Sequence, residues 1–352
     1  MLYTGIRKIK DPQERKRVIE KLMLLRRQLD RDIPGKTATN TLLLATWNIR
    51  KLGDGRKTES LYYIAEIISR FDLVAVQEVL GNKKDLEKIM SYLGKNWSYI
   101  ATDVTAGGSG AGECMAFLYD SNKVSFKNLA GEIVLPDNKL INGLQFARTP
   151  FCVSFQAGWF KFNLATVHIY YGTNSNNNKR RLSEIEALAK FLTGRAKSEK
   201  FNYVVLGDFN IPEVDGNYMK ALETNGFHIP NDIKAHPTDL GGTYHYDQIA
   251  FNLQLSKTMT IFREKEQGSG AFNFCESVYT EKDMPVYRYL FPEEQLAEVN
   301  EAGESVAKSE EDILDYYLKT YRTHQMSDHL PLWVELKVDF SSQYLVDLDK
   351  EF

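Results

Sequence analysis

The sequence predicts an α/β domain whose functional site lies at the ends of its strands. Apolar runs rich in β-branched and aromatic residues alternate with amphipathic stretches, a pattern typical of this fold class. Several of the apolar runs stop at a carboxylate, an amide or an imidazole. The chain has 352 residues, of which 43% are hydrophobic, so it is long enough to bury a sizeable core. Its length alone is compatible with about two domains.

The first 36 residues predict a basic helical extension. Eleven Lys and Arg against five Asp and Glu give residues 1–36 a net charge of +6. Asp11 is a candidate N-cap, followed by Pro12 at the first helical position, and Pro34 and Gly35 end the segment. The apolar stripe consists of Val18, Leu22, Leu25 and Leu29. Three readings stay open: packing of the stripe on the body, a short coiled coil that forms a homo-oligomer, and a basic face directed at DNA.

Residues 41–340 carry the α/β pattern of a single large domain. Amphipathic stretches at 58–71 and 179–192 predict helices, and the glycine-rich segment 105–112 and the Asn-rich segment 173–179 are typical of loops. The predicted strands lie within residues 42–47, 73–76, 116–119, 162–167 and 203–206.

An acidic segment interrupts this domain late in the chain. Residues 281–315 hold eleven acids against three basic residues, a net charge of −8. We expect an insertion over about 281–320 with one or two surface helices, starting near Pro292 and Ser309. A solvated insertion is the simplest reading, and regulation or partner binding are the alternatives. Residues 341–352 are expected to form a C-terminal tail.

Several classes of protein are excluded by what the sequence lacks. No apolar stretch approaches the 20 or so residues that span a bilayer, and the N-terminus does not resemble a signal peptide. Cys114, Cys152 and Cys275 are far apart, which argues against a disulfide framework or a zinc knuckle. We therefore expect a cytoplasmic protein without a membrane partner. Walker, GxGxxG and GxSxG motifs are absent, which excludes P-loop hydrolases, dinucleotide enzymes and α/β-hydrolases.

The polar residues at the strand ends form a coherent set. Because α/β folds place their active sites at strand ends, we expect these side chains to meet. Oxygen ligands without thiolates favour Mg²⁺, Mn²⁺ or Ca²⁺. Asn48, Arg50, Glu78, His168, Asp208 and Asn210 follow strands, and Asp247, Asp328 and His329 precede them.

The order and spacing of these motifs resemble a known family. The segments WNIR (47–50), QEV (77–79), HI (168–169), GDFN (207–210), YDQI (246–249) and SDH (327–329) are similar to the endonuclease/exonuclease/phosphatase superfamily. The deoxyribonuclease I-like branch is the most similar. The resemblance implies a four-layer α/β sandwich, in which two packed mixed β-sheets are flanked by helices.

The resemblance also implies a role for each residue. Glu78 and Asp328 would ligate the metal with Asn48 nearby, and the ion would be Mg²⁺ or Mn²⁺, with Ca²⁺ possible as a structural ion. His168 would be held by Glu113, and His329 would pair with Asp247. Asp208 and Asn210 would orient or activate the attacking water. Arg50 and Arg148 would bind phosphate oxygens, with Asn48 beside them.

These features predict a metal-dependent nuclease that hydrolyses phosphodiester bonds by in-line attack of water and leaves 5′-phosphates. Basic residues that flank the site favour DNA as the partner, since they can contact phosphates without regard to sequence. Alternatives are a related enzyme acting on RNA, inositol phosphate or phospholipid, and an inactive binding or scaffold protein. The candidate DNA contacts are Lys51, Arg56, Lys57, Lys179, Arg180 and Arg181.

Overall fold

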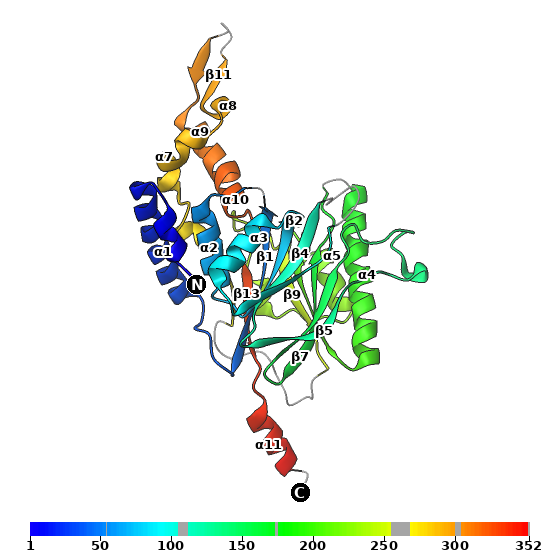
Figure 1. Ribbon diagram of the computed structural model, residues 1–352. Coiled ribbons are helices and arrows are strands. Elements are labelled where there is room, and N and C mark those ends of the chain that lie inside the picture. The colour runs from blue at the N-terminus through cyan, green and yellow to red at the C-terminus, as the bar shows by residue number, and fades with distance from the viewer. Residues whose placement is uncertain (54, 105–111, 173–174, 255–267, 300–303, 351–352) are drawn as a thin grey trace.

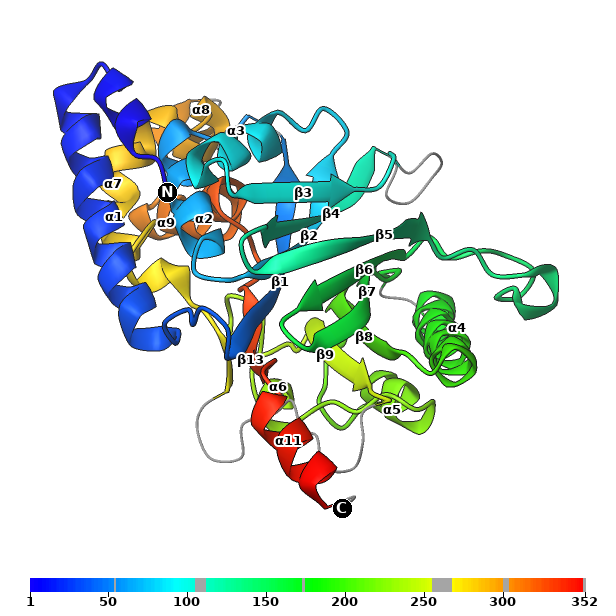
Figure 2. The ribbon, with the colours of Figure 1, turned by 60° about the horizontal axis from the view of Figure 1, so that its bottom comes forward.

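Two β-sheets pack face to face, and helices cover the outer surface of each sheet (Figure 1). The structure is a computed structural model that describes residues 1–53, 55–104, 112–172, 175–254, 268–299 and 304–350. Viewed along the layers, helices α1–α3 lie outside one sheet, and α4 and α5 lie outside the other (Figure 2). This arrangement confirms the four-layer sandwich that the motifs imply. The helices of these outer layers are α1 (Pro12–Asp32), α2 (Thr58–Ile68), α3 (Lys84–Leu93), α4 (Ser175–Glu199) and α5 (Asn217–Thr224).

All five predicted strands are present, and each is longer than its apolar run. The first sheet, in spatial order, consists of β10 (Ser269–Ala271), β13 (Leu332–Lys337), β1 (Thr41–Leu52), β2 (Leu73–Leu80), β4 (Glu113–Asp120) and β3 (Trp97–Ala101). The second consists of β5 (Val124–Glu132), β6 (Phe151–Ala157), β7 (Phe160–His168), β8 (Asn202–Asp208) and β9 (Asp247–Asn252).

The loop predicted at 173–179 is wrong from Ser175 onward, where α4 begins. Asparagines disfavour a helix interior, but the first turn of a helix tolerates polar residues because its N–H groups have no intrahelical partner. The glycine-rich loop at 105–112 lies outside the described residues apart from Gly112. The predicted helix at 58–71 corresponds to α2 and ends three residues earlier.

The central strands are buried on both faces, which explains their continuous apolar runs. In β1, Leu42 and Leu44 face the second sheet, where they join a core with Leu164 and Leu206. Leu43 of the same strand faces the helical layer instead, because successive side chains in a strand point to opposite faces. Each sheet therefore contributes to the core between the sheets.

The register of strand pairing brings the polar residues at the strand ends together. In the second sheet, His168 of β7 pairs with Asp208 of β8, and Asp208 pairs with Asp247 of β9. Gly207 precedes Asp208 with a φ of +134°, and a Cβ there would lie 2.2 Å from the carbonyl oxygen of Val167. Only glycine fits this close approach of two backbones.

Helix α1 packs its apolar stripe onto the body, as the first of the three readings expects. Asp11 accepts a hydrogen bond from the backbone N–H of Gln13 and so caps the helix. The stripe is buried in the core beneath the first sheet and is therefore unavailable for a coiled coil. Its members are Val18, Leu22, Leu25 and Leu29.

Several basic residues of α1 pair with acids of the same chain. Arg17 contacts Glu59 at 3.1 Å, Lys21 contacts Asp283 at 2.6 Å, and Arg26 contacts Glu66 at 3.0 Å. Much of the basic character of the extension thus compensates carboxylates of the body, two of them buried.

The acidic segment forms an arm that projects from the body (Figure 1). The predicted helix start at Ser309 is confirmed, since its side chain accepts a hydrogen bond from the backbone N–H of Asp312. Tyr287 and Tyr317 are buried at the base of the arm, so the segment is more than a solvated insertion. Its elements are η4 (Glu281–Asp283), α7 (Met284–Tyr287), η5 (Arg288–Leu290), α8 (Glu293–Leu296), the hairpin β11 (Ala297–Val299) and β12 (Ser305–Ala307), α9 (Glu310–Tyr316), η6 (Tyr317–Tyr321) and α10 (Arg322–Gln325).

Smaller elements complete the description, among them the 3-10 helices η1 (Thr4–Lys8), η2 (Asp137–Lys139) and η3 (Phe274–Glu276). Helix α6 (Asn231–Lys234) precedes β9, and the predicted tail contains helix α11 (Ser341–Asp349), which has no buried residue. Over the described residues, we find no helix with the length and apolar character needed to cross a membrane.

The pair of Arg17 and Glu59 provides a test of how α1 is attached. Glu59 is fully buried and accepts two hydrogen bonds from the Arg17 guanidinium, at 3.2 and 3.1 Å. Arg17→Ala leaves that carboxylate without its cation, so we expect the free energy of unfolding to fall by about 3 kcal/mol in urea denaturation. Lys16→Ala is the matched control, because its pair with Glu20 is exposed and is worth about 0.5 kcal/mol or less. Equal losses in the two variants would contradict this account.

Candidate active site

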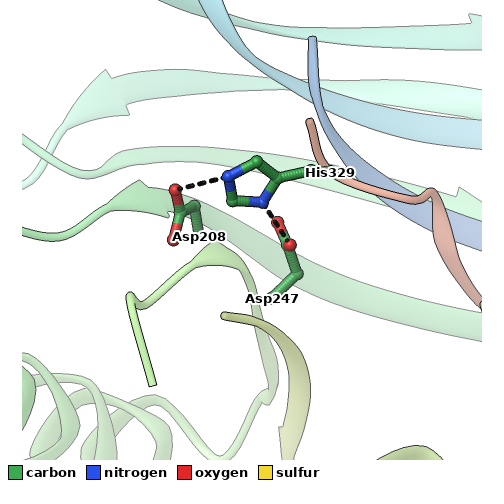
Figure 3. Close-up of side chains that lie close together, drawn as sticks. All are labelled: Asp208, Asp247 and His329. Atoms are coloured by element: carbon green, nitrogen blue, oxygen red, sulfur yellow. Dashed lines mark hydrogen bonds and ion pairs between the residues drawn. The ribbon is translucent and has the colours of Figure 1, made fainter. Parts of the chain in front are cut away.

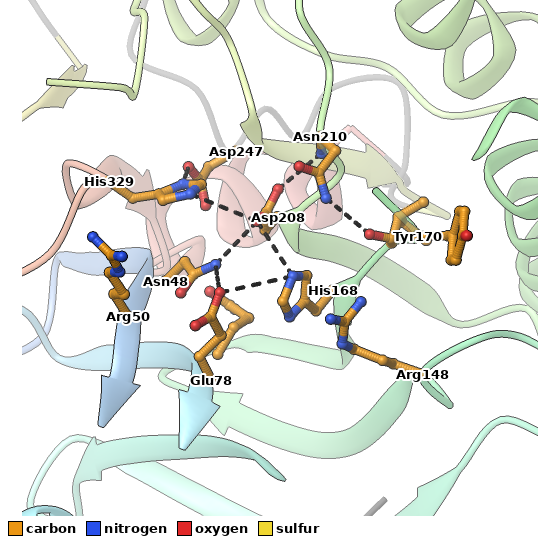
Figure 4. A network of polar contacts seen from close by, with 12 residues as sticks. Asn48, Arg50, Glu78, Arg148, His168, Tyr170, Asp208, Asn210, Asp247 and His329 are labelled. Carbon is orange, nitrogen blue, oxygen red and sulfur yellow. Dashed lines mark hydrogen bonds and ion pairs between the residues drawn. The ribbon is translucent and has the colours of Figure 1, made fainter. Parts of the chain in front are cut away.

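The polar strand ends from both sheets converge at one place (Figure 4). Asn48 and Glu78 come from β1 and β2 of the first sheet, whereas His168 and Asp208 come from β7 and β8 of the second. His329 enters from the segment before β13. The side-chain set predicted from the strand ends is thus largely assembled by the packing of one sheet on the other.

Asn48 joins the carboxylates of the two sheets. Its Nδ2 donates to Glu78 Oε1 and to Asp208 Oδ2, both at 3.0 Å. Its Oδ1 is buried, and no described residue donates a hydrogen bond to it. An unpartnered buried oxygen is costly in a protein, and the amide that carries this one bonds two carboxylates through Nδ2. Oxygen donors of this kind suit Mg²⁺ or Mn²⁺, so Asn48 and Glu78, with Asp208 adjacent, fit a divalent cation.

The backbone around these ligands adopts uncommon conformations. Glu78 and Asn210 have φ values of 57° and 54°, in the left-handed region that residues other than glycine rarely occupy. Such conformations cost about 1–3 kcal/mol each and cluster at functional sites. Asn210 is held there by hydrogen bonds: its N–H donates to Asp208 Oδ1 at 2.8 Å, and its Nδ2 donates to the carbonyl of Ile169 at 2.8 Å.

His329 and Asp247 form the predicted pair (Figure 3). His329 Nδ1 donates to Asp247 Oδ2 at 2.7 Å, and its Nε2 lies 3.8 Å from Asp208 Oδ2. Burial lowers the pKa of His329, but the carboxylates of Asp247 and Asp208 outweigh it and raise that pKa to about 10. Asp208, Asp247 and His329 lie close enough together to hold an ion, and within this trio His329 Nδ1 and Asp247 Oδ2 already pair with each other.

His168 occupies the opposite side of Asp208. Its Nε2 lies 3.6 Å from Asp208 Oδ2, and its Nδ1 lies 3.5 Å from Glu113 Oε2, as predicted. Arg148 Nε donates to the same Glu113 oxygen at 3.0 Å. Burial raises the pKa of Glu113, but His168 and Arg148 stabilise its charged form, and the net shift is downward. Glu113 therefore orients the imidazole and the guanidinium together.

Arg50 and Asp328 lie at the edge of this group. Arg50 Nη1 donates to Thr323 Oγ1 at 2.5 Å and lies 3.9 Å from Asp328 Oδ2. The side chain of Asp328 is 48% exposed and pairs with Arg50. The expected role of Asp328 as a metal ligand stays a prediction.

Two of the predicted DNA contacts are structural and must be corrected. Arg56 is buried, and its guanidinium donates to the backbone carbonyls of Arg50 and Lys51. Arg181 is also buried and donates to three carbonyls, at 2.8 Å to Asn210, 2.8 Å to Gly172 and 3.3 Å to Tyr170. Neither side chain is free for phosphate, because loop carbonyls already use its donors.

The other predicted contacts differ in exposure. Lys51 and Lys179 are exposed, and Lys57 is partly exposed. Arg180 is partly exposed, with its guanidinium 4.5 Å above the ring of Tyr170 and its Nε donating to Glu184 at 3.1 Å. The basic cluster after β7 thus contributes fewer free cations than its sequence suggests.

Sequence reasoning missed Ser327 and Glu184. Ser327 donates to the carbonyl of Asn48 at 2.6 Å and accepts from the N–H of His329 at 3.0 Å, so it fixes two site segments to each other. Glu184 is buried and accepts from the N–H groups of Ala147 and Tyr170, beside Arg148 and His168. Ser327 was visible as part of SDH, whereas Glu184 resembled any acid on an amphipathic helix.

The pair of His329 and Asp247 predicts a pH dependence in the metal-free protein. The pKa of His329 lies above its ordinary value of 6.5, so its proton stabilises the fold fully below pH 6.5, and this contribution is lost as the pH rises through about 10. Asp247→Asn should lower the pKa of His329, measured by ¹⁵N NMR titration. Asp232→Asn, at an exposed position, should leave it unchanged. A wild-type imidazole that titrates near 6.5 would contradict this assignment.

Comparisons with known proteins place this site in context. Solved structures of similar fold include an endonuclease/exonuclease/phosphatase family protein from Bacteroides thetaiotaomicron, 16% identical, with a TM-score of 0.51 over 86% of this chain and 99% of that one. A mannosyl-6-phosphatase from the same organism is 17% identical, with a TM-score of 0.50 over 84% and 99%. TDP2 from D. rerio, complexed with single strand DNA product, is 12% identical, with a TM-score of 0.50 over 84% and 98%.

At these identities the structures show a shared fold alone. No curated protein matches the sequence. Residues 45–271 match the Endonuclease/Exonuclease/phosphatase family, a span that includes β1, β2, β7, β8 and β9 and most of the site. The match covers more than half of the chain and confirms the resemblance drawn from the motifs. This protein belongs to the endonuclease/exonuclease/phosphatase family of hydrolytic phosphoesterases.

Proposed function

We propose that the protein is a divalent-metal-dependent DNA endonuclease that leaves 5′-phosphates. One observation carries this proposal: the Asp208 carboxylate lies between two imidazoles, at 3.6 and 3.8 Å, and beside the oxygen ligands Glu78 and Asn48. Hydrolysis of a phosphodiester requires an oriented water, neutralisation of charge on phosphate and a proton for the leaving oxygen. The side chains around Asp208 are suited to these three tasks.

Enzymes of this family generally use divalent metals. A cation held by Glu78 and Asn48 would neutralise charge on the scissile phosphate. The Oδ1 of Asn48 supports this assignment, because it is buried and finds no donor among the residues that the structure describes.

The surroundings of His329 bear on which group acts as base. Burial lowers the pKa of His329, but the carboxylates of Asp247 and Asp208 raise it above its ordinary value, which favours the charged imidazole and disfavours acceptance of a proton from water. Asp208 is therefore assigned as the group that orients the water and accepts its proton, with Asn210 fixing its Oδ1. Water gives its proton to Asp208 as its oxygen bonds to phosphorus, the bond from phosphorus to the 3′ oxygen breaks, and the 3′ oxygen takes up a proton from a solvent water.

The other nitrogen-bearing side chains around Asp208 are assigned to the phosphate oxygens. His329 Nε2 lies on one side of Asp208, and His168 and Arg148 lie on the other side. Arg50 is 35% exposed beside Asp328 and can extend this charge toward a neighbouring phosphate. Arginine suits this role because its planar fork matches phosphate.

DNA is favoured by the exposed lysines near the site, Lys51 and Lys179, which can contact phosphates of a long polyanion. The similar fold of TDP2, complexed with single strand DNA product, supports the same choice. The second candidate is a phosphatase acting on a small phosphate ester, favoured by the similar fold of the mannosyl-6-phosphatase. A substrate panel separates the two.

The proposed function predicts metal-dependent nicking of supercoiled plasmid DNA. Mg²⁺ should support nicking and excess EDTA should abolish it. His168→Ala and Asp208→Asn should each reduce turnover by about 10²–10⁴-fold, the usual contribution of acid–base groups. Glu186→Gln, an exposed position on α4, is the control. Cleavage in EDTA, or by His168→Ala at the wild-type rate, would refute the mechanism. Turnover of a phosphomonoester without DNA cleavage would favour the second candidate.

A further prediction distinguishes Lys179, a candidate DNA contact, from Arg181, a structural arginine on the same turn of α4. Lys179→Met should weaken DNA binding and reduce its salt dependence by about one phosphate contact, with kcat little changed. Arg181→Met should lower kcat by about tenfold or more, because it releases the backbone of Asn210, and it should leave the salt dependence intact. Titrations at several salt concentrations and single-turnover kinetics measure both. Loss of DNA affinity without loss of kcat in Arg181→Met would show that Arg181 contacts DNA and does not act through the loop carbonyls.

A further inference from the structure

Exposed tyrosines lie beside the reaction centre, and the mechanism above gives them no role. Tyr244 is 42% exposed and comes three residues before Asp247. Tyr171 is 53% exposed and comes three residues after His168. Aromatic rings at the rim of a site can offer flat apolar faces to a ligand.

The rings form an ordered stack that leads to the catalytic centre. Tyr244 and Tyr246 are nearly parallel, with centroids 5.0 Å apart and an interplanar angle of 17°. Tyr246 is only partly buried, and its ring centroid lies 5.6 Å from that of His329. Two stacked rings therefore reach the surface at Tyr244, and a tilted contact with an interplanar angle of 40° joins Tyr246 to His329.

The segment that carries Tyr244 is held rigidly. Asp239 accepts hydrogen bonds from the N–H groups of Thr243 and Tyr244, at 2.7 and 2.6 Å. The carbonyl of Tyr244 in turn accepts from the N–H of Thr238 at 2.8 Å, and the carbonyl of Tyr246 accepts from the N–H of Phe209 at 2.8 Å. The stack is thus preorganised, so little entropy is lost when a ligand adds to it.

We propose that Tyr244, supported by Tyr246, is a stacking platform for a nucleobase next to the scissile phosphate. This inference rests on the proposed function and adds a substrate class to it: DNA whose base at that position is unpaired. One face of Tyr244 meets Tyr246, and the exposed part of the ring can extend the stack by one flat ring. Base–aromatic stacking of this kind is sequence-tolerant, since every base has a π-face.

Duplex DNA fits this platform poorly. Inside a duplex, both faces of a base are covered by neighbouring base pairs, so only an end, a gap or a single strand offers a free face. The exposed Lys51 and the partly exposed Arg50, on the side of the site built by β1, can hold the backbone of such a strand. The enzyme should therefore prefer single-stranded or unpaired DNA to an intact duplex.

Binding measured without turnover tests the platform directly. A fluorescent 12-nucleotide single strand and its matched duplex are titrated in EDTA with wild type, Tyr244→Ala and Tyr244→Phe. Tyr244→Ala should weaken single-strand binding by about tenfold or more, which is the order of one base–ring stack. Duplex binding should change less than twofold or so, and Tyr244→Phe should resemble wild type because it keeps the ring. Tyr289→Ala, a tyrosine 76% exposed on the arm, is the matched control and should bind both probes normally.

A probe that lacks one base completes a double-mutant cycle with Tyr244→Ala. A single strand with one abasic position near the site should bind wild type more weakly but lose little affinity for Tyr244→Ala, because the two changes remove the same contact. Additive losses, or equal effects of Tyr244→Ala on single strand and duplex, would overturn the platform. Plasmid nicking by wild type in Mg²⁺ is measured separately. A negative result in the binding tests, with nicking intact, rejects only this inference. Absence of all DNA cleavage rejects the proposed function.

Discussion

The site depends on one constraint, the pairing of three strands in a single register. Backbone hydrogen bonds set His168 opposite Asp208 and Asp208 opposite Asp247, so an imidazole and two carboxylates stand in a row across the second sheet. A slip of one residue would turn each of these side chains to the other face. Packing of the first sheet then brings Asn48 and Glu78 against Asp208, and no single sheet could provide this combination.

Buried carboxylates inside the body are paired with Lys and Arg side chains. Asp72 is fully buried, yet it meets Lys123 at 2.8 Å and Lys36 at 3.3 Å and also accepts from the N–H of Leu43. Glu59 is held by Arg17 in the same manner, which ties the N-terminal helix to the layer beneath it. A charge buried alone would be strongly destabilising, so these pairs fix which segments must lie side by side. The near-neutral total charge of the chain conceals this internal compensation.

Much of the fold and the site was predictable from sequence, and the exceptions share a physical cause. Apolar runs ending in Asn48, Glu78, His168 and Asp208 identified strands and their functional ends, because burial and polarity are local properties of the sequence. The family resemblance, rather than the runs themselves, indicated two packed sheets. Arg56 and Arg181 could not be recognised as structural, because a guanidinium that binds loop carbonyls has the same sequence signature as one that binds phosphate. The hairpin of the arm was missed because β11 and β12 have three residues each and lack a long alternating pattern.

Helix α4 holds the backbone of several loops around the site. Arg181 holds the carbonyls of Tyr170 and Asn210, while Glu184 holds the N–H groups of Tyr170 and Ala147. The loop that follows His168 and the loops that carry Asn210 and Arg148 are therefore fastened to two adjacent turns of one helix. Local opening of any of these loops requires the same buried charges to lose their partners, so the loops should open as one cooperative unit rather than fluctuate independently. The catalytic groups of the second sheet would then be lost or retained together.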